Sequence, residues 1–112
     1  MMASDIYDYL ARYVERVEAE VGARRKVESS NSGFYRNALG GTAYVSFYPS
    51  ELDLTLDLSG VDEMYELVAD LTDQDGKIIV GDIFNFSGNA ELLKERLDNF
   101  LNDLVKLISD HL

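Results

Sequence analysis

Few residues of this chain combine the types and spacing that catalysis or thiolate chemistry requires. The single histidine, His111, is the second-last residue of the sequence. A charged imidazole there would favour a helix C-terminus, and a chain end is a poor support for catalytic geometry. The absence of cysteine excludes thiol nucleophiles, thiolate metal sites and disulfides. We therefore predict no catalytic residues and no enzymatic activity.

The segment from Asp73 to Ile78 resembles the middle of an EF-hand calcium loop, with acidic residues at alternate positions before a glycine. The register does not fit, because placing Gly76 at the sixth loop position puts the first ligand on Leu71 and the last on Asp82. The flanking residues are also typical of strands. We predict an acidic β-turn here, and no metal or other cofactor.

Two further segments lack the context needed to bind phosphate groups. Gly40-Gly41 is not followed by a helix, and no P-loop or dinucleotide-binding glycine pattern is present. The basic cluster Arg24-Arg25-Lys26 follows a predicted helix, whose C-terminal dipole favours cations. We therefore predict neither nucleotide-dependent activity nor direct nucleic-acid binding.

Net charge restricts the plausible partners more than any motif does. The 112 residues include 21 Asp and Glu against 10 Lys and Arg, a formal net charge of −11. Such a charge repels nucleic acids and anionic membranes and attracts basic protein surfaces. An alternative is adaptation to high salt, since the chain has 12 Asp but four Lys.

No apolar stretch is long enough to span a membrane and the start does not resemble a secretory signal, so we expect a cytoplasmic protein.

Two segments show the three- and four-residue spacing of apolar side chains that is typical of amphipathic helices. The first ends near Gly22, and its stripe comprises Ile6, Leu10, Tyr13, Val14 and Val17. The second follows Ser87-Gly88-Asn89, which we expect to end a strand and cap the helix. Its stripe comprises Leu93, Leu97, Phe100, Leu101, Leu104, Ile108 and Leu112.

The middle of the chain alternates apolar and polar residues, as half-buried strands do. Residues 51–58 alternate strictly between leucine and a polar residue. Residues 43–48 are rich in strand-forming types and are connected to them through Pro49-Ser50. We predict a hairpin from these two segments.

Residues 61–71 are ambiguous, because their apolar residues fit one face of a helix or one face of a strand. The following residues, 72–77, have the composition of a tight turn and continue directly into Ile78-Ile79-Val80. This favours a strand at 64–71 and a second hairpin, with Gly76 at positive φ.

The segment from 23 to 41 has the weakest pattern. Lys26 to Ser29 fits a short strand, whereas Ser30 to Gly33 and Gly40-Gly41 are typical of turns. We predict a single α+β domain over residues 1–112. Its antiparallel meander of four to five strands would be packed on one face by the N-terminal and C-terminal helices.

The sheet face opposite the helices is the best candidate for a binding surface. If the leucines of 52–58 point inward, the residues between them point outward. The last strand is predicted to be apolar on both faces, with Ile78, Val80 and Phe84 on one face and Ile79 and Ile83 on the other. This leaves surface for a partner or a second copy unless residues 23–41 cover it. We predict that a partner contacts Tyr44, Tyr48, Asp53, Thr55, Asp57, Glu66 and Val68.

Three functional hypotheses follow. The first is a non-catalytic protein that binds and neutralises a basic partner, such as a nucleic-acid enzyme or toxin. In size and charge the chain resembles phage-encoded inhibitors of host defence and bacterial immunity proteins. The second is a dimeric chaperone or adaptor, because the order of elements resembles that of the acidic type III secretion chaperones. That resemblance implies a helix between strands, which residues 64–71 would supply. The third is a small-ligand protein or enzyme.

Overall fold

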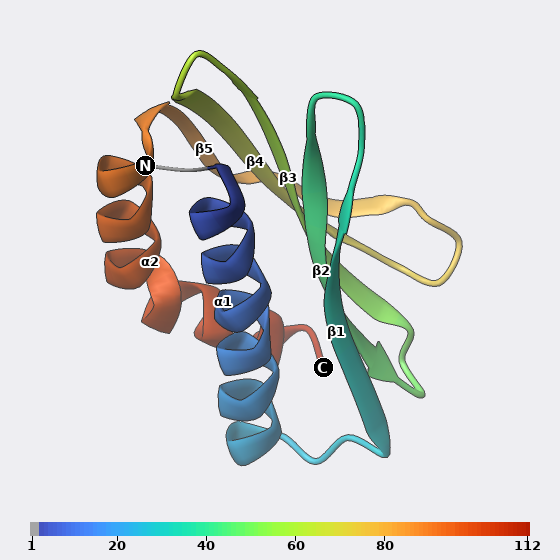
Figure 1. Ribbon diagram of the computed structural model, residues 1–112. Coiled ribbons are helices and arrows are strands. Elements are labelled where there is room, and N and C mark those ends of the chain that lie inside the picture. The colour runs from blue at the N-terminus through green and yellow to red at the C-terminus, as the bar shows by residue number, and fades with distance from the viewer. Residues whose placement is uncertain (1–2) are drawn as a thin grey trace.

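The computed structural model describes residues 3–112, which form one five-stranded sheet with two helices on the same face (Figure 1). The sheet is antiparallel, and its spatial order is the chain order. This arrangement confirms the predicted α+β meander. In chain order the elements are α1 (Ala3–Arg24), β1 (Ser29–Arg36), β2 (Gly40–Tyr48), β3 (Leu52–Val61), β4 (Met64–Thr72), β5 (Ile78–Asn89) and α2 (Ala90–Asp110).

The core lies between the helix layer and the facing side of the sheet. The alternating leucines of β3 are all buried, as predicted, and each contributes roughly 1.5–3 kcal/mol relative to an exposed side chain. Both predicted helix stripes pack against them, although Phe100 and Leu112 are only partly buried. Helix α1 continues two residues beyond the predicted end at Gly22. The buried helix residues include Ile6, Leu10, Tyr13, Val14 and Val17 of α1, and Leu93, Leu97, Leu101, Leu104 and Ile108 of α2.

Residues 64–72 form strand β4, which confirms the predicted strand over the alternative helix. Leu67 lies opposite Leu58 of β3, and Ala69 lies opposite Leu56. The two-residue spacing of apolar side chains in this segment therefore matches the buried face of its neighbour. The predicted hairpin between 43–48 and 52–58 is also confirmed as the pair β2 and β3.

Strand β1 differs from the prediction. It spans Ser29–Arg36, so the predicted strand at 26–29 and the predicted turn at 30–33 are both wrong. The Ser30 and Ser32 hydroxyls donate to the Glu18 carboxylate of α1 at 2.6 and 2.7 Å. A polar sequence without alternating apolar residues thus forms a strand because it gains the β2 ladder and this contact with α1.

The start of β2 also corrects an expectation. Gly40 and Gly41 are the first residues of this strand instead of a turn, and they pair with Ser59 and Leu58. Because β1 pairs with the edge of β2, the segment from 23 to 41 extends the sheet sideways. It does not cover the face opposite the helices (Figure 1).

Strand β5 is longer and less regular than predicted. It continues through Ser87 and Gly88 to Asn89, whose side chain caps α2 by accepting a hydrogen bond from the Leu92 N–H at 2.9 Å. The cap was predicted at this segment, whereas the end of the strand was placed too early. Register shifts opposite Asp70 and Leu71 break the simple alternation of the strand. The predicted shared face of Ile78, Val80 and Phe84 is therefore wrong, because Ile78 pairs with Thr72 on the outer face, whereas Val80 and Phe84 pair with residues on the helix side.

Candidate binding face

The outer face is the side of the sheet opposite the helices. Residues directly opposite each other in antiparallel strands project to the same side, so the register defines this face. Its rows across β2, β3 and β4 are Ser46–Asp53–Thr72, Tyr44–Thr55–Asp70, Thr42–Asp57–Val68 and Gly40–Ser59–Glu66. Six of the seven predicted contact residues stand in these rows, and Tyr48 follows at the end of β2, opposite Ser29. The structure thus brings all seven to one face.

Acidic residues dominate the sheet, while basic residues are concentrated elsewhere. Residues 29–89 include ten of the 21 acidic residues but only two of the ten basic ones, Arg36 and Lys77. The Arg36 guanidinium lies on the helix side, 4.8 Å from the ring centroid of Tyr7. Lys77 belongs to the turn between β4 and β5. The rows of the outer face therefore carry carboxylates and no Lys or Arg.

Four carboxylates stand on the outer face, and they differ in their hydrogen bonding. Asp57 accepts a hydrogen bond from the Thr42 hydroxyl at 2.7 Å. Asp70 accepts one from the backbone N–H of Asp82 at 2.9 Å, which satisfies an amide that the irregular part of β5 removes from the ladder. Among residues 3–112, no side-chain hydrogen bond or ion pair involves Asp53 or Glu66. These two carboxylates are available to a partner.

Aromatic rings flank the acidic rows on the β1 side. The Tyr44 ring lies over Gly33, where an added Cβ would approach the Tyr44 hydroxyl oxygen to 2.7 Å. It also contacts Tyr35, with ring centroids 6.2 Å apart. Tyr35 is 56% exposed. It was missing from the predicted face because the strand that contains it was interpreted as irregular, and extending the alternation of β2 across a fifth strand would have found it.

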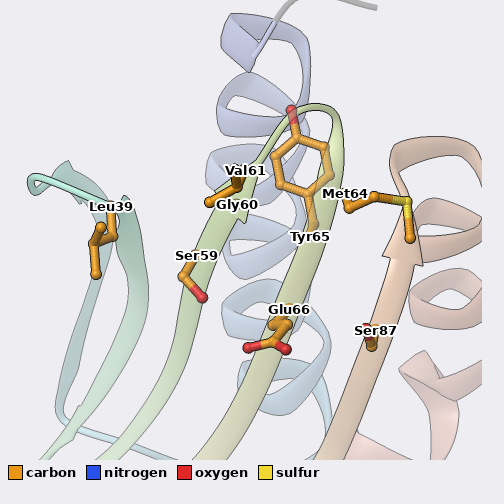
Figure 2. Close-up of a pocket in the computed structure, with 8 residues that line it drawn as sticks. All are labelled: Leu39, Ser59, Gly60, Val61, Met64, Tyr65, Glu66 and Ser87. Carbon is orange, nitrogen blue, oxygen red and sulfur yellow. The ribbon is translucent and has the colours of Figure 1, made fainter.

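A hollow opens at the end of the outer face nearest the β1–β2 and β3–β4 turns. Its volume is about 310 Å³. Figure 2 shows Leu39 on one side and Met64 on the other, with Ser59 and Glu66 between them. The apolar rim is unusually accessible, since Leu39, Val61 and Met64 are 69%, 70% and 54% exposed. The hollow is lined by Leu39, Ser59, Gly60, Val61, Met64, Tyr65, Glu66 and Ser87.

Small residues and a fixed turn create this hollow. Gly40 approaches the β3 backbone so closely that an added Cβ would lie 2.1 Å from the Leu58 carbonyl oxygen. The β1–β2 turn is held beside β3 by a hydrogen bond from the Gly60 N–H to the Leu39 carbonyl at 3.0 Å. Short side chains at Ser59 and Ser87 flank Glu66 in the same row. A carboxylate therefore stands in a depression with apolar residues at its edge.

The lining of the hollow extends the predicted site. Among its residues, only Glu66 was predicted from the sequence. Ser59 continues the alternation of β3 by one step and could have been inferred from it. Leu39 could not be predicted from the sequence pattern, because it joins the face only where the β1–β2 turn lies beside the β3–β4 turn. Burial raises the pKa of the Tyr65 phenol above its ordinary value, which already lies well above neutral pH.

The acidic turn after β4 is a backbone structure. Gly76 has φ of 76°, as predicted, and the Asp73 carboxylate accepts hydrogen bonds from the N–H groups of Asp75 and Lys77 at 2.9 and 3.0 Å. Within the described part of the chain, no group of three or more His, Asp or Glu residues is placed to hold a metal ion.

His111 caps α2, with its ring Nδ1 2.9 Å from the Leu107 carbonyl oxygen.

Comparison of the chain with protein-family models, curated proteins and solved structures found no match. In residues 3–112, neither helix combines the length and apolar composition that crossing a membrane requires.

Proposed function

We propose that this chain is a non-catalytic binding module that holds and neutralises a basic protein through the outer face of its sheet. The observation that supports this most directly is the segregation of charge. The outer face carries four carboxylates and no Lys or Arg in its rows, while the cations lie mainly on the helix layer and its connections. A partner with a positive patch could pair with these carboxylates directly, because no ion pair among residues 3–112 would have to break first.

Electrostatics would act at two ranges in such a complex. The net charge of −11 attracts a basic partner over about 8 Å at physiological ionic strength and accelerates association. At contact, Asp53 and Glu66 would accept charge-assisted hydrogen bonds, and Tyr35 and Tyr44 would add stacking area. Affinity is therefore expected to fall as the salt concentration rises.

The chaperone or adaptor hypothesis remains the second candidate, supported by the exposed apolar rim of the hollow. Its expected helix between strands is not present, because residues 64–72 form β4. An adaptor that held a client mainly through apolar contacts would keep it at high salt. Salt dependence therefore separates the two hypotheses.

The test is an affinity capture from a lysate of the source organism, washed at low and at high salt, with charge-reversal variants as baits. One bait carries Asp53→Lys and Asp57→Lys on the outer face. Its matched control carries Glu95→Lys and Asp103→Lys, two exposed positions of α2 with the same total change of charge. Asp53→Lys alone is included because it leaves the hydrogen bond between Thr42 and Asp57 intact.

We expect the original chain and the α2 control to retain one basic protein at low salt and to lose it at high salt. The outer-face variants should lose it in both washes, while circular dichroism shows them folded. Equal retention by both double variants would refute the proposed face. Retention that survives high salt would favour the adaptor, and a bait without partners would favour simple adaptation to high salt.

A further inference from the structure

We propose, building on the function above, that the hollow is the anchoring pocket for one arginine side chain of the basic partner. The hollow joins two features that an arginine requires. It has an apolar rim for the aliphatic stem, and it has a carboxylate without a cation among the described residues. Basic side chains commonly bury their methylene groups along apolar surface while the charged end meets polar groups.

The rim supplies the apolar contact. Leu39, Val61 and Met64 surround the opening, and each is more than half exposed in the free protein. Exposed apolar side chains gathered around one depression mark an interaction site more clearly than single exposed residues do. An extended side chain entering between Leu39 and Met64 would cover this rim (Figure 2).

The floor supplies the polar recognition. Ser59, Glu66 and Ser87 stand in one row across β3, β4 and β5, with the carboxylate in the centre. A guanidinium group has five N–H donors in a planar arrangement and pairs with a carboxylate through two parallel hydrogen bonds. The hydroxyls on either side can accept further bonds. An ammonium group has one compact charge and three donors, so arginine is expected to bind better than lysine.

The volume is consistent with a single side chain. At about 310 Å³ the hollow lies at the small end of the range for ligand pockets. A second, shallower depression of about 490 Å³ adjoins it and shares Leu39, Ser59 and Glu66 with it. This depression continues along the outer face past Asp57 and Val68. The partner's backbone next to the bound arginine would lie in it.

The experiment is an NMR titration of the full chain with N-acetyl-arginine-amide, with N-acetyl-citrulline-amide and N-acetyl-lysine-amide as comparison probes. Citrulline keeps nearly the same shape without the charge. We expect arginine to shift the amide resonances of Gly60, Met64 and Glu66 in a saturable way. Lysine should bind several-fold more weakly, and citrulline should cause no saturable shift.

Two variants test the two parts of the hollow. Glu66→Gln removes the charge and should weaken arginine binding about tenfold, as expected for the loss of a charged hydrogen bond. Ser59→Leu fills the hollow while keeping the carboxylate, and should also abolish the saturable shifts. Glu95→Gln on α2 makes the same change of net charge as Glu66→Gln and should bind as the original chain does.

Equal shifts with arginine and citrulline, or equal affinities of Glu66→Gln and Glu95→Gln, would overturn the arginine pocket. So would unchanged binding by a folded Ser59→Leu variant. Arginine shifts around Asp53, with none around the hollow, would also reject the pocket while leaving the acidic outer face supported. The proposed function has its own test in the capture experiment, which changes Asp53 and Asp57 and leaves Glu66 in place.

Discussion

Tyr13→Phe should destabilise the protein at neutral pH and lose that effect at high pH. Tyr13 is 1% exposed, and its hydroxyl joins the two helices by donating to the Leu97 carbonyl at 2.8 Å. Removing the hydroxyl deletes a hydrogen bond of typical net value, about 1 kcal/mol. The Leu97 carbonyl remains part of α2, so its other helical contacts are not disturbed. We therefore expect the variant to be less stable by about 1 kcal/mol at pH 7.

The dependence on pH follows from the environment of the phenol. Burial raises the pKa of Tyr13, and the nearby Asp98 carboxylate adds to this, whereas Arg16 opposes it. A pKa raised in the folded state contributes stability that is complete below the unfolded pKa of about 10 and is lost as pH rises above it. At about pH 11, ionisation of an unfolded tyrosine stabilises the unfolded chain by about 1.4 kcal/mol. Phenylalanine has no such ionisation, so the stability difference should vanish or reverse sign.

The assay is urea unfolding followed by circular dichroism, on both proteins at pH 7 and about pH 11. Ionisation of the other tyrosines and of the lysines occurs in both proteins and largely cancels in the difference. Tyr35→Phe is the matched control, because its ring is 56% exposed and surface changes usually alter stability by less than about 0.5 kcal/mol. A Tyr13→Phe difference that is the same at both pH values would refute the buried contact between the helices.

Substitutions at three further positions test the two helices and the pairing of β2 with β3, each by urea unfolding against the original chain. Asn89→Ala removes the cap of α2 and should cost about 1 kcal/mol, whereas Asn89→Asp should cost much less. Gly22→Ala adds a methyl group to α1 that would meet no atom within 4 Å beyond the adjoining residues and backbone of its own helix, and should raise the free energy of unfolding by about 0.5 kcal/mol. The same change at Gly40 would place Cβ 2.1 Å from the Leu58 carbonyl oxygen, so it should destabilise by several kcal/mol and reduce amide protection in β2 and β3. A Gly40→Ala variant as stable as Gly22→Ala would contradict this close approach of the strands.

Local periodicity was sufficient to predict most of the elements. The leucine alternation over 51–58 predicted the buried and exposed sides of β3, and the helical stripes predicted the layer that covers the sheet. The ambiguous segment at 64–71 was resolved by the turn sequence after it, because a tight turn of this composition is typical of a hairpin between two strands. A side-chain period of two assigns every second residue to the same face, which is why seven contact residues could be placed on the outer face.

The remaining features depend on contacts between residues far apart in the chain. The polar segment at 29–36 becomes a strand only because it pairs with β2 and because Glu18 of α1 binds its serines. The hollow forms where the turn containing Leu39 meets Gly60 of β3 and Glu66 of β4, which come 21 and 27 residues later in the chain. Neither effect changes the local periodicity of the sequence, since each depends on which distant backbone lies alongside. Sequence patterns therefore predicted the acidic face, whereas tertiary packing alone produced the pocket within it.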